Sequence, residues 1–306
     1  MSSPTEAPVG ESAGAHTRTA TDPDRSLARS RSPAMETFTS TAWRRGSAYR
    51  VLARLRSPLG VYTVPLVVLV LWQLASSSGW IAPEFAASPV QIYSSAVGLW
   101  RAGLLGPDLA ISLTRAGAGL ALGLAVGILA GTVAGLWRAG EQAFNGVVQI
   151  LNTVPLLALL PLMIVWFGIG EESKVLLIAL GAGVPIYLNL FAAIRGVDRG
   201  LIEMAVAAGA GRWRLIRRLL LPGALPGLLV GLRFALAYSV LGLVAAEQIN
   251  ADSGVGFMIS QAQTYERVDE IYLGIVIYAV LGLLADQIVR VLERALLTWR
   301  PTYQGS

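Results

Sequence analysis

Long apolar runs separated by short polar segments dominate the chain from residue 59 onward. About 20 helical residues cross a hydrocarbon core of about 30 Å, and each run is close to that length. Between the first two runs, Ser88 and Pro89 are a favourable N-cap and first helical residue for a short amphipathic helix. The pattern predicts an all-α, polytopic membrane protein with six transmembrane helices, near 59–76, 112–137, 146–167, 174–195, 222–246 and 271–293.

Residues 1–42 have a different composition. They are rich in Ser, Thr, Ala, Pro and Arg and contain almost no large apolar side chains, so they bury too little surface to offset the entropy of ordering. The arginines are reminiscent of a targeting peptide, but acidic residues interrupt them and no small-residue cleavage site follows the first apolar run. We therefore expect an uncleaved, disordered cytoplasmic tail, with residues 43–306 forming the transmembrane domain.

Arginine and lysine are distributed unevenly between the connecting segments. With a cytoplasmic N-terminus, the outer side receives only Arg101, Arg115, Lys174 and Arg267. Because positive residues accumulate on the cytoplasmic side, we expect both termini to be cytoplasmic. The inner side then holds fifteen arginines: Arg44, Arg45, Arg50, Arg54, Arg56, Arg138, Arg195, Arg199, Arg212, Arg214, Arg217, Arg218, Arg290, Arg294 and Arg300.

Glycine recurs every fourth residue in the second apolar run. Such ladders let helix backbones approach closely in lipid, where no hydrophobic effect holds helices together. A step of four residues turns a helix by about 400°, so the stripe drifts by about 40° per step and we expect it to touch more than one neighbouring helix. The ladder consists of Gly119, Gly123, Gly127, Gly131 and Gly135.

Prolines interrupt the third and fourth runs. Pro155 and Pro161 lie in the third run, and Pro185 follows two glycines in the fourth. A proline inside a helix frees a backbone carbonyl that another group must satisfy. Broken helices are usual where a transporter lines its pathway, whereas a simple packing kink is the commoner explanation for a single proline. The sequence leaves both readings open.

One arginine falls at membrane depth. Arg233 lies about 16 Å into the fifth run at 1.5 Å per residue, where a charge costs about 3 kcal/mol on insertion scales and needs a partner or water. Asp286 in the sixth run is the candidate partner. The two residues are compatible with a structural ion pair or with a role in an anion pathway.

Composition excludes several classes of chemistry. The chain has 306 residues, of which 54% are hydrophobic and 14% charged, and it contains no cysteine. Its single histidine, His16, lies in the polar tail, so neither a metal site nor a Ser-His-Asp triad is expected in the membrane part. The only lysine, Lys174, is not part of a nucleotide-binding P-loop. The net charge of +5 follows from the membrane topology and requires no nucleic-acid partner.

The segment LIEMAVAAGAGRWRLIRRLLLP, residues 201–222, lies between two apolar runs. Its second half carries Arg214, Arg217 and Arg218 at helical spacing, which suits an interfacial helix that meets anionic lipid head groups. Its first half is rich in alanine and nearly uncharged. Such a surface has too little bulk to anchor in lipid but can fit closely into a groove on another protein.

The same segment resembles the EAA loop of ABC importer permeases, in which E-A-A is followed after three residues by Gly and then, nine residues later, by I-x-L-P. Glu203, Ala205, Gly209, Leu221 and Pro222 fall at matching positions, while Met204 and Leu219 replace an alanine and an isoleucine. The segments SLTRAGAGLALGLAVGILAG, NTVPLLALLPLMIVWFGIGEESK, AAEQINADSGVGFMI and LLADQIVRVLERALLTWRP are similar to permeases of the nitrate, sulfonate and taurine group, and the last is most similar to aliphatic sulfonate permeases.

The resemblance implies the fold of a type I ABC importer permease and a division of labour between subunits. The segment 196–221 is then a cytoplasmic coupling loop that docks on a separate ATPase, and an extracytoplasmic binding protein delivers the substrate. ATP and Mg act on the ATPase, so this chain would bind no cofactor and would not be an enzyme. The expected contact residues are Glu203, Ala205 and Gly209, with Met204, Arg212 and Trp213 added as neighbours.

The resemblance implies import of a small oxyanion by a homodimeric permease in the cell inner membrane. The substrate that it implies is an aliphatic sulfonate, with nitrate or a taurine-like compound as alternatives. The alternative is a secondary transporter driven by an ion gradient. That alternative predicts intramembrane carboxylates for proton or cation coupling, and Asp286 is the only candidate well inside an apolar run.

Overall fold

The computed structural model describes residues 58–80, 82 and 84–297, and the predicted tail 1–42 lies outside this part of the chain. The described residues are helical and contain no β-strand, which confirms the all-α prediction. The helices are α2 (Pro58–Ser77), α3 (Pro89–Arg101), α4 (Leu105–Leu136), α5 (Arg138–Thr153), η2 (Leu156–Leu159), α6 (Leu160–Phe167), α7 (Glu171–Arg195), α8 (Arg199–Ala207), α9 (Arg212–Leu215), η3 (Ile216–Leu220), α10 (Leu221–Asn250), α11 (Val255–Thr264) and α12 (Val268–Leu296).

The chain divides into two compact units, residues 1–65 and 66–306. In the first, the structure describes only residues 58–65, which open α2. The second unit contains every other helix and is the subject of the description below.

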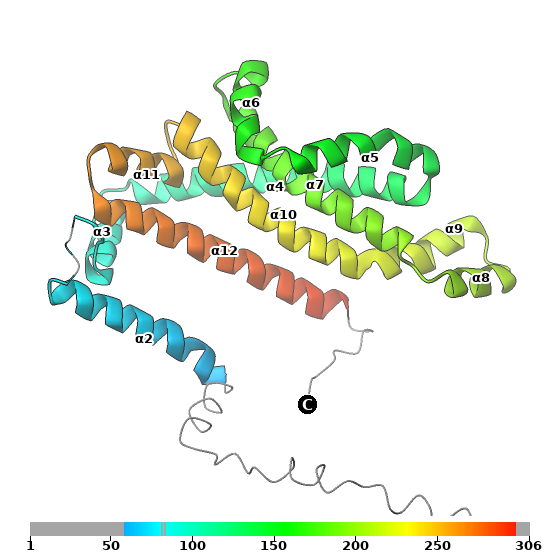
Figure 1. Ribbon diagram of the computed structural model, residues 1–306, viewed down its shortest axis with the longest axis horizontal. Coiled ribbons are helices and arrows are strands. Elements are labelled where there is room, and N and C mark those ends of the chain that lie inside the picture. The colour runs from blue at the N-terminus through cyan, green and yellow to red at the C-terminus, as the bar shows by residue number, and fades with distance from the viewer. Residues whose placement is uncertain (1–57, 81, 83, 298–306) are drawn as a thin grey trace, which may run out of the picture. The chain divides into compact units, whose positions relative to one another are not determined.

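Helix α7 is the central element of the second unit, with α4 and α10 packed along it (Figure 1). The glycine ladder of α4 faces α7 along its whole length. A Cβ built on Gly119 would lie 2.5 Å from the Ile178 Cβ, and one on Gly127 would lie 2.6 Å from the Gly183 carbonyl oxygen. Side chains at these positions would force the two helices apart, so the glycines permit the close approach.

The expectation that the ladder touches more than one neighbour is wrong. From Gly119 to Gly135, the atoms nearest to each added Cβ all belong to α7. The drift of about 40° per step holds for a straight helix packed on another straight helix. Two helices that wind around each other keep such a stripe in contact with a single partner.

A second ladder of glycines, on α10, covers another side of α7. A Cβ on Gly231 would lie 3.0 Å from the Asn189 Cβ and 3.2 Å from the Pro185 carbonyl oxygen, and one on Gly227 would overlap Ala193. Gly223 continues the spacing of four toward Val197, just beyond the end of α7. Close packing on α7 from two sides therefore rests on small residues in both neighbours.

The third apolar run is broken. Helix α5 ends at Thr153, a 3₁₀ turn follows Pro155, and α6 begins at Leu160 with Pro161 in its first turn. The two halves, Arg138–Thr153 and Leu156–Phe167, meet at an angle of 102°. Pro185, by contrast, lies inside a continuous α7. Of the two readings that the prolines left open, a break holds for the third run and not for the fourth.

Among the described residues, four helical stretches are long and apolar enough to span a bilayer: Leu105–Leu136, Glu171–Arg195, Arg212–Ile249 and Val268–Leu296. The bent pair α5 and α6 would make a fifth. The apolar part of the first run, Thr63–Ser77, is shorter. The count of six spans stays a prediction.

The fifth run begins earlier than the sequence suggested. Helices α9, η3 and α10 continue one another from Arg212 to Ile249, although the span was expected near 222–246, after a coupling loop at 196–221. The turn at Ile216–Leu220 is a π-helix, in which the Leu221 N–H donates to the Ile216 carbonyl. Proline lacks an N–H and crowds the carbonyl four residues earlier, and a wider turn before it relieves that conflict.

The short helix between the first two runs is confirmed. Ser88 is the N-cap of α3 and Pro89 its first residue. The Gln91 N–H donates to the Ser88 hydroxyl at 3.2 Å, and the Ser88 N–H donates to the Gln91 side-chain oxygen at 2.8 Å. This reciprocal pair is a capping box, which explains why the helix begins at this residue.

Candidate functional sites

The segment 199–215 forms a short helical hairpin, which we call the elbow. Helices α8 and α9 make its two arms, and the elbow lies at the end of α7 and α10 opposite to α11 (Figure 1). Asp198 caps α8 by accepting a hydrogen bond from the Gly200 N–H at 2.7 Å. The elbow is therefore an ordered extension of the two central helices.

Gly209 makes the turn of the elbow. It has φ +79°, in the left-handed region that favours glycine. The Gly209 N–H donates to the Val206 carbonyl at 2.9 Å, and the Ala210 N–H donates to the Ala205 carbonyl at 3.0 Å. These two bonds form a Schellman motif, which satisfies the carbonyls at the end of α8. Gly209 is thus required by backbone geometry, whereas Gly211, with φ −69°, is not.

The elbow presents apolar side chains at its surface. Met204 is 61% exposed and Trp213 is 72% exposed, and Leu201 and Val206 are also exposed. Glu203 and Arg212 are exposed beside them, while Ala205 is half-buried. All six residues expected from the sequence therefore lie on one short hairpin. An exposed apolar surface framed by charges is typical of a surface that another molecule covers.

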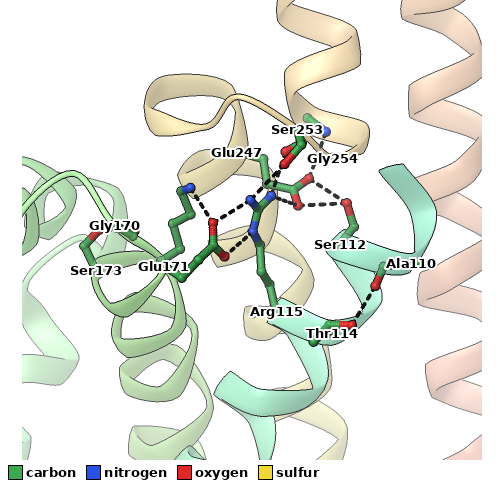
Figure 2. A network of polar contacts seen from close by, with 12 residues as sticks. Ala110, Ser112, Thr114, Arg115, Gly170, Glu171, Ser173, Glu247, Ser253 and Gly254 are labelled. Atoms are coloured by element: carbon green, nitrogen blue, oxygen red, sulfur yellow. Dashed lines mark hydrogen bonds and ion pairs between the residues drawn. The ribbon is translucent and has the colours of Figure 1, made fainter. Parts of the chain in front are cut away.

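A buried polar network, which the sequence analysis did not anticipate, lies at the opposite end of the helices (Figure 2). Arg115 of α4 is 4% exposed. Its Nε and Nη2 donate to the two Glu171 carboxylate oxygens at 2.7 Å each, and its Nη1 donates to Glu247 Oε1 at 2.8 Å. Nη1 also donates to the Ser253 carbonyl at 2.7 Å. One guanidinium thus joins α4, α7, α10 and the loop before α11.

Glu247 is fully enclosed in this network, with 0% exposure. Its carboxylate accepts hydrogen bonds from the Ser112 hydroxyl at 2.8 Å, the Gly256 N–H at 2.9 Å and the Tyr278 hydroxyl at 3.2 Å, besides the Arg115 bond. A buried carboxylate is tolerated when it is paired with a charge and its remaining lone pairs are satisfied. Glu247 meets both conditions.

The network also fixes the beginning of α11. The Gly254 N–H donates to Asp108 Oδ1 at 2.8 Å, the Val255 N–H donates to the Ser112 hydroxyl at 2.9 Å, and the Gly256 N–H donates to Glu247. The first N–H groups of a helix lack partners within the helix, and here three side chains from α4 and α10 supply them. Helix α11 is thereby tied to the ends of two long helices.

The sequence contained a weak signal for this network. Arg115, Glu171 and Glu247 each lie in one of the segments SLTR, GEESK and AAEQ that carry the family resemblance. Arg115 is 56 residues from Glu171 and 132 residues from Glu247 in the chain, so periodicity along the sequence does not connect the three. Only the folded arrangement shows that they form one cluster.

Arg233 and Asp286, which the sequence suggested as partners, lie close together between α10 and α12. The Arg233 Nε is 3.5 Å from Asp286 Oδ1, and its Nη2 is 3.1 Å from Glu293 Oε2. Asp286 also pairs with Arg290 one turn along α12, at 2.6 Å. The sequence analysis missed Glu293 and Arg290. Arg233 is 46% exposed, so this cluster lies at the surface of the chain, unlike the Arg115 network.

Long apolar helices that pack closely through glycine ladders, with an exposed elbow between two of them, are the features of a polytopic membrane protein. Residues 123–298 match the family described as binding-protein-dependent transport system inner membrane component, and the chain belongs to that family. It is the multi-pass membrane permease of an ABC importer, a transport subunit.

Three curated relatives show which permeases within the family the chain is similar to. The chain is 43% identical over 240 residues to the putative aliphatic sulfonates transport permease protein SsuC of Escherichia coli (strain K12), covering 78% of this chain and 91% of the relative. It is 42% identical over 242 residues to the corresponding Bacillus subtilis (strain 168) protein, covering 79% and 88%. It is 34% identical over 243 residues to the taurine transport system permease protein TauC of Escherichia coli (strain K12), covering 78% and 88%.

Solved structures agree on the fold. An amino acid ABC transporter crystallised with histidines gives a TM-score of 0.55 at 17% identity, covering 65% of this chain and 97% of that chain. The MetNI methionine ABC transporter, in an inward-facing conformation, gives a TM-score of 0.50 at 22% identity, covering 62% and 97%. The ABC importer permease fold expected from the resemblance is confirmed.

Proposed function

We propose that this permease forms the passage for a small oxyanion, namely an aliphatic sulfonate, with nitrate-like and taurine-like anions as neighbouring possibilities. The observation that carries the proposal is the similarity of 42–43% identity to two permeases named for aliphatic sulfonates, over 78–79% of this chain. The relative named for taurine, itself a sulfonate, is 34% identical. At this lower identity the relatives differ in substrate, because the riboflavin transport system permease protein RibX of Chloroflexus aurantiacus is 35% identical. The sulfonate assignment therefore rests on the two relatives at 42–43% identity.

The elbow is the proposed contact for a separate ATPase subunit. Its exposed apolar surface at Met204 and Trp213, beside Glu203, Ala205 and Arg212, has the character of a protein contact. The Schellman turn at Gly209 holds the two arms in a fixed relation. Because α9 runs on through η3 into α10, a displacement of the elbow reaches the membrane through one continuous helical stretch. ATP and Mg act on the ATPase, and the permease itself binds no cofactor.

The remaining partners complete the importer. A second copy of this chain supplies the other half of the passage, and an extracytoplasmic binding protein delivers the anion to the side that carries α11. The complex lies in the cell inner membrane, with both termini of the permease cytoplasmic. The arginine excess of the segments on the elbow side supports this orientation.

Reconstituted transport tests this function. The permease is incorporated into liposomes with its cognate ATPase and binding protein, and uptake of labelled alkanesulfonate, taurine, nitrate and sulfate is compared. We expect ATP-dependent uptake of the alkanesulfonate, abolished when the P-loop lysine of the ATPase is replaced. Uptake of another anion alone would overturn the substrate assignment. Uptake that survives ATP depletion and collapses with the proton gradient would favour the secondary transporter.

A further inference from the structure

The break between α5 and α6 lies beside a small cavity of about 180 Å³, which we call the break cavity. Its lining includes Asn152, Thr153 and Pro155 at the break, Gly181 of α7 and Tyr238 of α10. Gly181 lets Leu156 and Tyr238 pack closely against α7 here, because a Cβ at this position would lie 2.9 Å from Leu156 Cδ2 and 3.6 Å from the Tyr238 Cβ. The cavity therefore sits where a broken helix meets two continuous ones.

The break cavity lies near the middle of the long helices. Gly181 is about 15 Å from the start of α7, and Tyr238 is about 26 Å from the start of α10, at 1.5 Å per residue. Helix α7 runs from Glu171 to Arg195 and α10 from Leu221 to Asn250, so both residues lie close to the helix centres. The centre of a spanning helix is the part farthest from water on either side.

Two polar side chains of this cavity, Asn152 and Tyr238, are exposed on the described part of the chain, Tyr238 to 44%. Within the described part of the chain, neither the Asn152 amide nor the Tyr238 hydroxyl makes a hydrogen bond, whereas the Thr153 hydroxyl donates to the Ile150 carbonyl at 2.8 Å. An amide or hydroxyl without a partner at this depth costs free energy if it faces hydrocarbon. Such groups persist where water or a passing solute satisfies them.

We infer that the break cavity is a point of passage at which the permease contacts the oxyanion through neutral donors, the amide N–H groups of Asn152 and the hydroxyl of Tyr238. This inference rests on the proposed function for the identity of the anion, but not for the location of the site. The oxygens of a sulfonate or a similar oxyanion accept hydrogen bonds from these groups.

Neutral donors suit passage better than a charged site does. Conduction requires binding that is strong enough to admit a solute and weak enough to release it. The Arg115 guanidinium is buried and engaged with Glu171 and Glu247, and Arg233 is paired with Asp286 and Glu293, so both charges already have carboxylate partners. The break cavity offers hydrogen bonds without a fixed countercharge.

A larger cavity is a poorer candidate. It has about 450 Å³ and lies between α4, α5, α6 and α7, with Leu122, Val126, Met163 and Trp166 among its lining residues. This lining is almost wholly apolar, and an anion that entered it would lose its hydration without compensation. Cavity volume alone therefore does not identify the point of passage. The polar lining of the break cavity identifies it.

The absence of cysteine allows a direct test in the full complex. Single cysteines replace Asn152 or Tyr238, and the control is Leu283→Cys, at a similar depth on α12, exposed and outside the break cavity. Each variant, assembled with its ATPase and binding protein in liposomes, is treated with sulfonatoethyl methanethiosulfonate, a water-soluble anionic thiol reagent. The reagent reacts with the thiolate, so the rate reports access of water and anion to the position.

We expect Asn152→Cys and Tyr238→Cys to react at least about ten times faster than Leu283→Cys, because a thiolate forms only where water reaches it. Equal rates at the three positions would overturn the inference, whatever the natural substrate is. Where the wild-type complex imports an alkanesulfonate, Asn152→Leu and Tyr238→Phe should also reduce uptake several-fold while the binding protein still stimulates ATP hydrolysis. Undiminished uptake in both variants would overturn the assigned donors, whereas failure of the wild type to import any sulfonate would remove only the proposed substrate.

Discussion

Arg115 and Glu247 form a buried ion pair between α4 and α10, with the Arg115 Nη1 2.8 Å from Glu247 Oε1 and exposures of 4% and 0%. Each charge is compensated by its partner and by further hydrogen bonds. A buried charge is costly when it stands alone, so the two residues depend on each other.

Removal of one partner should destabilise the permease strongly. We expect Arg115→Ala to lower the free energy of unfolding by about 3–5 kcal/mol, because it leaves the Glu247 carboxylate buried and unpaired. Thermal unfolding in detergent, followed by loss of the monodisperse fraction, measures the effect. Glu171→Gln is the matched comparison, because the Glu171 side chain is 58% exposed and water can compensate the lost charge. An equal loss of stability in both variants would contradict the conclusion that burial makes the Arg115–Glu247 pair costly to break.

The glycine ladder predicts opposite effects for two substitutions in the same helix. Gly127→Ala places a Cβ 2.6 Å from the Gly183 carbonyl oxygen, whereas Gly117→Ala meets nothing within 4 Å. We expect Gly127→Ala to destabilise by about 1–3 kcal/mol through overpacking. Gly117→Ala should be neutral or stabilising by up to about 1 kcal/mol, because alanine favours the helix. Thermal unfolding of the two variants compares them directly. The same sign for both would refute the close α4–α7 contact.

The turn of the elbow predicts a difference between two neighbouring glycines. Gly209→Ala forces alanine into a backbone with φ +79°, at a cost of about 1 kcal/mol, whereas Gly211→Ala occupies ordinary backbone with φ −69°. We expect Gly209→Ala to weaken co-purification with the ATPase and Gly211→Ala to leave it unchanged. Equal retention of the ATPase by both variants would show that the geometry of the turn does not matter for docking.

The cluster around Arg233 allows a structural role to be separated from a transport role. Arg233 links α10 to α12, whereas Arg290 pairs with Asp286 within α12. For a structural pair we expect Arg233→Ala to cost about 1 kcal/mol and Arg290→Ala a few tenths, with uptake following stability in both. Thermal unfolding and uptake are measured on the same preparations. Lost uptake at unchanged stability in Arg233→Ala would instead indicate a role in the anion pathway.

Local features of the fold were predictable from the sequence. The Ser88 cap, the helical character and the suitability of Gly209 for a turn each follow from interactions within a few residues of the chain. The partnership of Arg233 with Asp286 was also suggested, because a charge at membrane depth restricts the choice of partner. Glu293 was missed because it lies near the end of the same helix, where a carboxylate can reach water and needs no partner within the membrane.

Features that depend on packing between distant segments were not predictable. Which helix the α4 ladder faces depends on how α4 and α7 wind around each other, and a straight-helix argument gave the wrong answer. Arg115 and Glu247 are 132 residues apart and meet only because the N-terminal part of α4 packs beside the C-terminal end of α10. The break cavity requires the bend after Thr153 to bring Asn152 toward Tyr238.

Site-specific photocrosslinking tests the central claim, that the elbow is the surface on which the ATPase docks. A photoreactive phenylalanine analogue replaces Trp213 or, as a control, Tyr265, which is equally surface-exposed but lies at the opposite end of the molecule beyond α11. After irradiation of the assembled importer, we expect the analogue at position 213 to form a covalent adduct with the ATPase and the one at position 265 to form none. Absence of an ATPase adduct at position 213 in an intact, ATP-hydrolysing complex would contradict the account.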